Sequence, residues 1–230
     1  MNAASRSVWV SFLVAFAALL PLINPIGSAL ILLGLVGDEP VMVYRRLARK
    51  IAIATVLFLI VIDSMGSLLL GFFGISLPVL QVTGGMVMAA TAWSLLFEAD
   101  AGATAQKKHK EIGSPGSKDV EGLKGKIFYP FTFPITAGPG TLVVMITLSA
   151  RVPNHGVQQT IASHAGILFA VLVLSIIVYG CYAYAPRLIQ AVSPSTVHGI
   201  LRVIAFILMC IGVQIAWNGI ATLGATLAHK

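Results

Sequence analysis

Two short proline-glycine segments interrupt long apolar stretches of this chain. They are residues 21–28, with the sequence PLINPIGS, and residues 134–141, with the sequence PITAGPGT. Each is followed by a second apolar run, at 29–36 and 142–148, which is the pattern of a membrane helix broken near its centre. An unpaired backbone group in hydrocarbon costs several kcal/mol, so protein, water or a ligand must satisfy it. Two such breaks at matching places in the two halves of one chain indicate a transport site.

The composition favours a membrane setting. Hydrophobic residues make up 57% of the 230 residues and charged residues only 10%, and the charges lie between the apolar runs. A helix needs about 20 apolar residues to cross a hydrocarbon core of roughly 30 Å. Runs of that length occupy residues 8–36, 51–73, 75–97, 127–149, 164–185 and 197–227. We therefore predict an all-α integral membrane protein with six transmembrane helices, of which spans 1 and 4 are broken near the membrane midplane.

The basic residues predict the topology. Those that follow spans 1, 3 and 5 are Arg45, Arg46, Arg49, Lys50, Lys107, Lys108, Lys110, Lys118, Lys124, Lys126 and Arg187. The opposite side has only Arg6, Arg151 and Lys230. By the positive-inside rule the first set is cytoplasmic, and both termini are then expected outside, in the periplasm. The net charge of +7 thus reflects topology and does not indicate a nucleic-acid partner.

Residues 99–125 form the one long polar stretch and are predicted to be a cytoplasmic linker. They separate a first repeat, residues 1–98, from a second, residues 126–230, within one membrane domain. Because each half holds three spans, a duplicated half must insert upside down relative to its partner. Span 3 carries Leu80-Gln81-Val82 and span 6 carries Leu201-Arg202-Val203, an offset of 121 positions between residues 81 and 202. These observations predict two inverted 3+3 repeats.

At these residues the chain resembles the MarC family of bacterial inner-membrane proteins, also grouped as neutral amino acid transporters. The resemblance covers nearly the whole chain. The segments that carry it most specifically are Ala137-Gly138-Pro139-Gly140-Thr141, Asn24-Pro25, Phe73-Gly74-Ile75-Ser76-Leu77-Pro78, Gly212-Val213-Gln214 and Asn218-Gly219. The resemblance implies six spans, an inverted repeat, a place in the inner membrane and, for some members, transport of small neutral amino acids. One departure is Gln81, which stands where the family pattern has Arg and so removes a charge.

The two breaks can bind an anion through their backbone groups. Each creates a half-helix whose N-terminus carries about half a positive charge and free N–H groups, which together bind anions. An amino acid carboxylate could accept those N–H groups, with a hydroxyl from Ser28 or Thr141, while unwound carbonyls receive the ammonium group. The candidate substrate-binding residues at the breaks are Asn24, Pro25, Gly27, Ser28, Gly138, Pro139, Gly140 and Thr141. The alternative is a pair of kinked helices whose freed groups are covered by neighbouring spans.

Asp63 is the one acidic residue in the middle of a span. A carboxyl group at that depth must be neutral, paired or functional. The functional interpretation is proton coupling, and the alternative is a structural ion pair or a neutral, hydrogen-bonded acid. Arg202, the one basic residue inside a span, is the natural partner if the two helices touch.

Other polar residues within the spans are further candidates for substrate contact. Gln81 lies on the small-residue face of span 3, where helix packing is the plainer interpretation. Gln214 and Asn218 present amides from one face of span 6, either to a substrate or to a neighbouring helix. His155 and His164 lie near the outer edge of span 5, where we expect them to be interfacial and solvated.

We therefore expect a secondary transporter for small neutral amino acids or similar metabolites that works by alternating access. No GxxxxGK[ST] phosphate loop is present, so a gradient of protons, sodium or the substrate itself would supply the energy. Apart from the substrate and any coupling ion, the lipid bilayer is the expected partner, and no cofactor or metal is expected. The alternative is a channel or a nontransporting structural or regulatory membrane protein. The spans contain no GxSxG, HExxH or paired acids, so an enzyme is not expected.

Overall fold

The computed structural model describes residues 3–37, 39–98, 127–152, 156–187 and 194–228, and every regular element within them is helical. The elements are α1 (Ala3–Ile23), α2 (Pro25–Val36), α3 (Val41–Phe72), α4 (Leu77–Glu98), η1 (Ile127–Thr136), α7 (Pro139–Ala150), α8 (Val157–Ala183) and α10 (Pro194–Ala228). The all-helical fold class is confirmed. The predicted linker at 99–125 lies outside the described residues.

The helices are long and apolar enough to cross a membrane. Among the described residues five helices meet this test, and a sixth span results when the bent pair η1 and α7 is counted as one. The boundaries differ from the prediction most clearly at α3. This helix begins at Val41, so Arg45, Arg46 and Arg49 lie on the helix and not in a loop. Arginine and leucine are good helix formers, which lets the helix continue past the apolar run.

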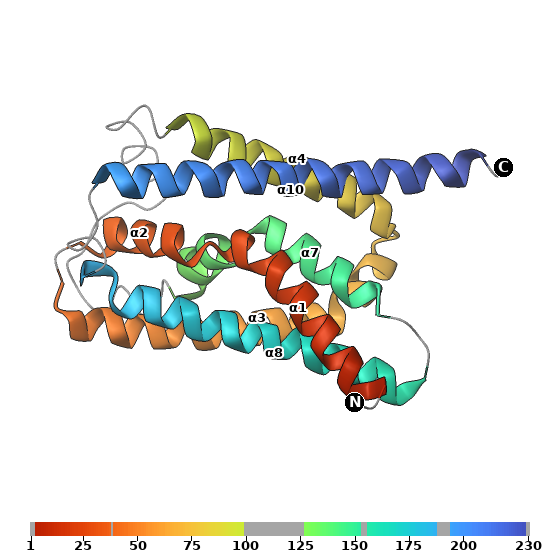
Figure 1. Cartoon of the computed structure of the whole chain (residues 1–230), viewed down its shortest axis with the longest axis horizontal. Helices are drawn as coiled ribbons and strands as arrows, with labels where there is room; N and C mark the ends of the chain where they lie inside the picture. The colour runs from red at the N-terminus through yellow and green to blue at the C-terminus, as the bar shows by residue number, and fades with distance from the viewer. Residues whose placement is uncertain (1–2, 38, 99–126, 153–155, 188–193, 229–230) are drawn as a thin grey trace.

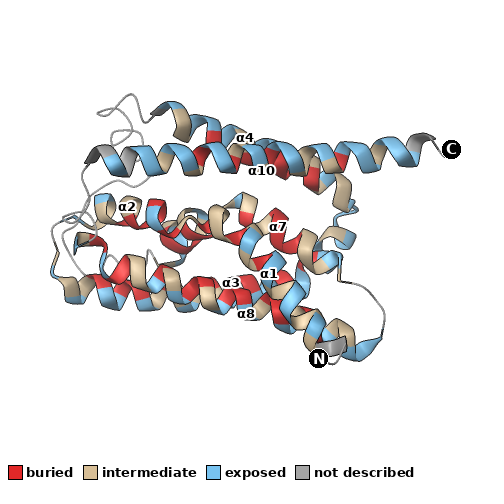
Figure 2. Cartoon of the chain, viewed as in Figure 1, coloured by how far each residue is buried: buried red, intermediate tan, exposed pale blue. Residues whose placement is uncertain are grey.

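The surface has the polarity expected of a protein in lipid. Large apolar side chains face outward along the spans, including Phe72, which is 83% exposed, and Trp217, which is 64% exposed. Several polar side chains are buried instead, among them Ser28, Asp63 and Thr141. Figure 2 shows exposed residues distributed along the outer faces of every layer. An apolar surface of this extent suits hydrocarbon and would promote association in water.

The helices form three layers (Figure 1). α3 and α8 form one outer layer, and α4 and α10 form the other. The middle layer holds both interrupted spans, α1 with α2 and η1 with α7. α1 and α2 pack on α8, η1 and α7 pack on α3, and α7 also contacts α4. The interrupted backbone therefore lies between two layers of continuous helices.

Glycines set the close contact between α4 and α10. A Cβ atom on Gly85 would lie 2.6 Å from the carbonyl oxygen of Gly212 and 2.5 Å from the backbone nitrogen of Ala216. A Cβ atom on Gly212 would lie 2.9 Å from the carbonyl oxygen of Gly85 and 2.7 Å from the nitrogen of Ala89. Small residues allow this approach, and in membranes such packing is a main source of helix association.

We expect Gly85→Ala to destabilise the protein because its methyl group would meet backbone atoms that cannot move aside as a side chain could. Overpacking of this kind costs about 1–3 kcal/mol. Thermal unfolding in detergent measures the loss. Gly224→Ala is the matched control, because no described atom lies within 4 Å of the added Cβ. That variant should be unchanged or slightly stabilised, since alanine favours a helix. Equal melting temperatures for the two variants would contradict the close contact between α4 and α10 at Gly85.

Candidate functional site

The first break is at Asn24, between α1 and α2. Asn24 has φ 43° and ψ 67°, a left-handed conformation that asparagine tolerates better than most residues. Its side-chain oxygen accepts a hydrogen bond from the Gly27 N–H at 3.0 Å. Pro25 follows as the first residue of α2, where a missing N–H is harmless. The break is thus an asparagine cap of α2.

Gly27 and Ser28 complete this cap. A Cβ atom on Gly27 would clash with the Asn24 side-chain nitrogen, so a larger residue would require the capping amide to move. The Ser28 hydroxyl donates to the Asn24 carbonyl at 2.8 Å, and the Ser28 N–H donates to the same oxygen at 2.9 Å. The first break therefore uses its own side chains to satisfy groups that were expected to bind a substrate.

The second break is wider. Within η1, Tyr129 and Phe133 have extended backbone angles, and each precedes a proline, Pro130 and Pro134, across a cis peptide bond. η1 and α7 are bent relative to each other by 72°. The Thr136 hydroxyl donates to the carbonyl of Phe131 at 2.7 Å, which satisfies one of the carbonyls freed by the irregular backbone.

The N-terminus of α7 is less completely capped than that of α2. Its N-cap residue is Gly138, which has an extended conformation and no side chain to accept an N–H. Pro139 and Gly140 open the helix, and Thr141 follows in its first turn. The Thr141 side chain is 1% exposed, and its hydroxyl has no hydrogen-bond partner among the described residues. A buried hydroxyl without a partner is costly, so a water molecule or a polar ligand would stabilise this position.

Tyr182 on α8 connects the two breaks. Its phenol oxygen lies 2.7 Å from the Thr136 hydroxyl of η1. The Ser28 side chain of α2 lies near the same phenol. Tyr182 is fully buried. Segments from both breaks therefore approach one side chain of a continuous helix.

α4 closes the other side of the second break. A Cβ atom on Gly140 would meet the Met88 sulfur of α4 at 2.6 Å and the Leu22 side chain of α1 at 3.4 Å. Gly84 of α4 packs against Val143 of α7 in the same way. Gln81 is one turn earlier on α4 and only 3% exposed, so it lies on the buried side of this helix.

The candidates on α10 lie apart from the buried break residues. Arg202 and Gln214 are exposed, and Asn218 is half-buried. The Gln214 side-chain nitrogen donates to the Asn218 side-chain oxygen at 3.0 Å, so this amide pair bonds within its own helix. The structure thus places the eight break residues in the middle layer, and it places Arg202 and Gln214 outside that layer. Of the eight, Pro25, Gly27, Ser28 and Thr141 are buried, Asn24, Gly138 and Gly140 are half-buried, and Pro139 is exposed.

Asp63 pairs with a residue other than the one expected. Its carboxylate Oδ2 lies 3.0 Å from Nδ1 of His164 on α8, while Oδ1 is buried with no partner in the described part of the chain. The Ser149 hydroxyl of α7 donates to the Asp63 backbone carbonyl at 2.8 Å. His164, which was expected near the outer edge of span 5, is the eighth residue of α8, and its side chain is 32% exposed. His155 lies outside the described residues.

Sequence reasoning missed Tyr182, His164 and Thr136 as members of these clusters. Tyr182 is one of several tyrosines near the end of span 5, where an interfacial aromatic residue is also expected. Only tertiary contact distinguishes it from Tyr179 and Tyr184. Thr136 did lie within the second break segment, so its position carried a signal.

Long apolar helices surround the two interrupted segments, which carry buried polar side chains. This arrangement defines a multi-span integral membrane protein. The sequence model of the MarC family integral membrane protein matches residues 9–223, so the chain belongs to the MarC family. The inner membrane protein MarC of Citrobacter koseri is 30% identical over 208 residues, and that of Salmonella typhimurium is 29% identical over 208. The Escherichia coli protein of the same name is 27% identical over 205 residues. Each match covers 88% of this chain and 90% of the relative. No solved structure matches the chain significantly.

We expect Tyr182→Phe to destabilise the protein because it removes the phenol hydroxyl that pairs with the Thr136 hydroxyl. The loss of a buried hydrogen-bond partner costs about 1–3 kcal/mol. Tyr179→Phe is the matched control, since Tyr179 lies on the same helix and is partly exposed. Melting temperatures in detergent provide the comparison. A Tyr182→Phe protein as stable as the control would show that the phenol does not hold the breaks together.

Proposed function

We propose that this chain is a secondary transporter that moves small neutral amino acids or similar metabolites across the bacterial inner membrane. The observation that carries the proposal is the α7 N-terminus, where the Gly138 cap offers no side chain and the buried Thr141 hydroxyl lacks a partner among the residues described. The relatives named as inner membrane proteins support the location. The resemblance to the neutral amino acid transporter family supports the substrate class.

The binding mode follows from charge. The α7 N-terminus presents backbone N–H groups and a partial positive charge, which favour a carboxylate without any basic side chain. The Thr141 hydroxyl would donate a further hydrogen bond to the same carboxylate. The first break is self-capped through Asn24 and Ser28, so we assign the carboxylate to the second break alone. The carbonyls of the irregular segment η1 would receive the ammonium group.

The contacts between helices favour an inverted repeat. Span 1 is α1 with α2, spans 2 and 3 are α3 and α4, span 4 is η1 with α7, and spans 5 and 6 are α8 and α10. Exchanging spans 1–3 with spans 4–6 maps the packing of α1 and α2 on α8 onto that of η1 and α7 on α3. The same exchange maps the contact of α4 with α7 onto that of α10 with α1. Gly85 and Ala89 contact Ala216 and Gly212 reciprocally, which pairs 85 with 212 and 89 with 216. Both pairs are 127 positions apart. This register differs from the offset of 121 between Gln81 and Arg202.

Alternating access would use the layers as its moving parts. α4 and α10 pack mainly against each other, and their contacts with the rest of the protein are made chiefly by α4 on α7. This pair can therefore rock on the middle layer while α3 and α8 stay fixed to the interrupted spans. We propose that such motion exposes the α7 N-terminus to one side of the membrane and then to the other.

We propose that both termini face the periplasm. Figure 1 shows α1 beginning and α10 ending toward the same end of the bundle. The basic residues Arg45, Arg46 and Arg49 lie at the start of α3, toward the opposite end. The positive-inside rule assigns that end to the cytoplasm.

The coupling ion proposed here is a proton held by Asp63 and His164. A buried carboxylate beside an imidazole can exchange one proton between two bases, and an ionisable residue at this depth is expensive unless it is used. The basic residues of α3 end at Lys50, more than three turns before Asp63, and Arg6 on α1 and Arg151 after α7 are exposed. The Asp63–His164 pair joins α3 to α8, and α8 also carries Tyr182, which contacts Thr136 at the second break. We propose that a change in the protonation of the pair shifts α8 and so moves Tyr182 relative to that break.

The function is tested with purified protein in liposomes. Saturable, stereoselective counterflow of labelled alanine or glycine is expected, because a carrier exchanges substrate without net flow. A channel would give flux that does not saturate and shows no counterflow. A folded protein that moves none of a broad amino acid panel would refute the transporter proposal.

We expect Thr141→Val to raise the KM of counterflow about 10- to 100-fold, the effect of losing one hydrogen bond to a charged group. Valine keeps the shape and removes the hydroxyl. Thr147→Val is the matched control on the same helix, because its hydroxyl is also buried without a described partner but lies away from the N-terminus. If both variants keep the parent KM, the carboxylate does not bind at Thr141.

We expect Asp63→Asn to abolish accumulation driven by a pH gradient while counterflow persists, since exchange needs no net proton movement. His164→Gln should weaken the driven accumulation in the same assay. Ser64→Ala is the control on the neighbouring position of α3, where the hydroxyl donates only to the Ile60 carbonyl. Unchanged proton-driven uptake in Asp63→Asn would remove the coupling role and leave the transporter proposal intact.

A further inference from the structure

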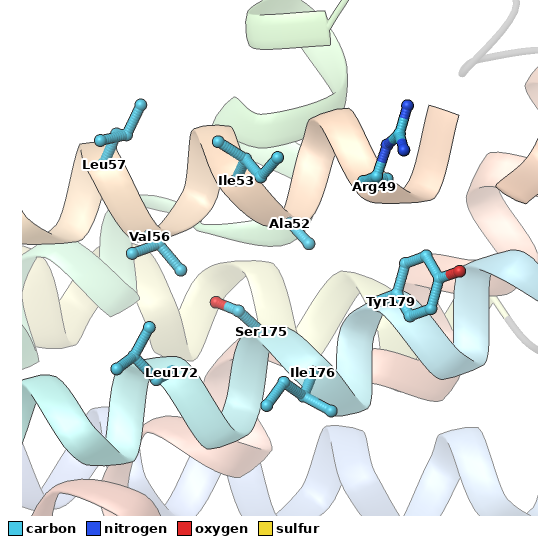
Figure 3. Close-up of a pocket in the computed structure, with 9 residues that line it drawn as sticks. All are labelled: Arg49, Ala52, Ile53, Val56, Leu57, Leu172, Ser175, Ile176 and Tyr179. Carbon is cyan, nitrogen blue, oxygen red and sulfur yellow. The ribbon is translucent and has the colours of Figure 1, made fainter. Parts of the chain in front are cut away.

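A groove opens on the outer face of the bundle between α3 and α8, with a volume of about 410 Å³. Its walls are nearly all apolar, with Ile53, Val56 and Leu57 from α3 and Leu172 and Ile176 from α8. Figure 3 shows Val56 and Leu172 between the two helices, with Ile53 and Leu57 on the side of α3 farther from α8 in this view. The groove lies outside the middle layer and plays no part in the site proposed above.

The two ends of the groove differ in polarity. Arg49 on α3 and Tyr179 on α8 lie toward one end, and Leu57 and Leu172 lie toward the other (Figure 3). Positions 49 and 57 are eight residues apart on one helix, so the groove extends about 12 Å at a rise of 1.5 Å per residue. A long apolar slot with one cationic end matches the shape of a lipid, an acyl chain below an anionic headgroup.

Further cations lie at the same end. The Arg45 guanidinium is 5.2 Å from the centre of the Tyr184 ring and donates to its hydroxyl at 3.3 Å. The Arg187 guanidinium lies 5.9 Å from the centre of that ring. No ion pair joins Arg45, Arg49 or Arg187 to an acidic residue in the part of the chain that the structure describes. The mouth of the groove is therefore a site of positive charge.

One polar group lies within the apolar wall. Ser175 lines the groove between Leu172 and Ile176, and its hydroxyl is buried without a partner among the described residues. In Figure 3 its oxygen points into the space between the helices. The ester oxygens of a phospholipid lie a short distance below its phosphate, at a depth where this hydroxyl could donate to one of them.

We propose that the groove between α3 and α8 binds one anionic phospholipid, with its phosphate at Arg49 and an acyl chain along Ile53, Val56 and Leu172. Basic pockets between transmembrane helices on the cytoplasmic side are suited to anionic headgroups. Charge complementarity at Arg49 selects an anionic lipid over a zwitterionic one. The occupant contacts both helices that carry the Asp63–His164 pair, so its binding also stabilises that interface.

The test is retention of lipid by the full-length protein. Protein reconstituted in bilayers of equal phosphatidylglycerol and phosphatidylcholine is extracted in mild detergent, and native mass spectrometry counts the lipids that remain. We expect preferential retention of one phosphatidylglycerol. Arg49→Gln should weaken its binding about five-fold, the effect of one basic residue near an anionic headgroup, and Arg49→Lys should restore most of it.

Two further variants separate the headgroup from the slot. Ala52→Leu fills the groove and should reduce the binding of both lipids. Arg46 lies about one turn before Arg49 and does not line the groove. Arg46→Gln therefore removes an equal charge outside the groove, and this variant should retain phosphatidylglycerol. Circular dichroism confirms that each variant is folded. Equal retention of the two lipids by the parent protein, or an Arg49→Gln variant that binds like the parent, would overturn the proposal whatever the transport assays show.

Discussion

The structure depends on the rule that backbone polar groups inside a bilayer must find partners within the protein. Both interrupted spans lie in the middle layer, between α3 and α8 on one side and α4 and α10 on the other. The first break meets the rule by itself, because the Asn24 side chain caps Gly27. The second leaves Thr141 without a partner among the described residues. Continuous helices cover part of the irregular backbone, including Phe131, Thr132 and Thr136, whereas Tyr129 and Pro139 remain exposed.

The sequence predicts the class of fold well and the contacts poorly. Span length and apolar composition depend on local sequence alone, so the six runs and both breaks can be identified from the order of the residues. The pairing of Asp63 with His164 joins residues 101 positions apart, and no local pattern encodes it. The apolar run at 51–73 puts the start of α3 too late, because charge ends an apolar run whereas arginine sustains a helix. Tyr182 differs from its neighbouring tyrosines only in its packing.

The two halves of the chain use similar elements for different purposes. Asparagine followed by proline makes a closed cap at the first break, whereas glycine followed by proline leaves the α7 N-terminus without a side-chain cap at the second. The two breaks therefore differ in whether a side chain already occupies the N-terminus of the second half-helix. Gln81 and Arg202 differ as well, since one is buried and the other exposed. The two halves of the chain are in this way chemically unequal.

The Tyr182 phenol has one hydrogen to donate. The Thr136 hydroxyl gives its own hydrogen to the Phe131 carbonyl, so the phenol is the donor in its contact with Thr136. The Ser28 hydroxyl of the other interrupted span lies near the same phenol, and its hydrogen goes to the Asn24 carbonyl. A rotation about the phenol C–O bond would turn the phenol hydrogen from Thr136 toward Ser28. Movement of η1 away from α8 would therefore release a hydrogen-bond donor that the first break can accept.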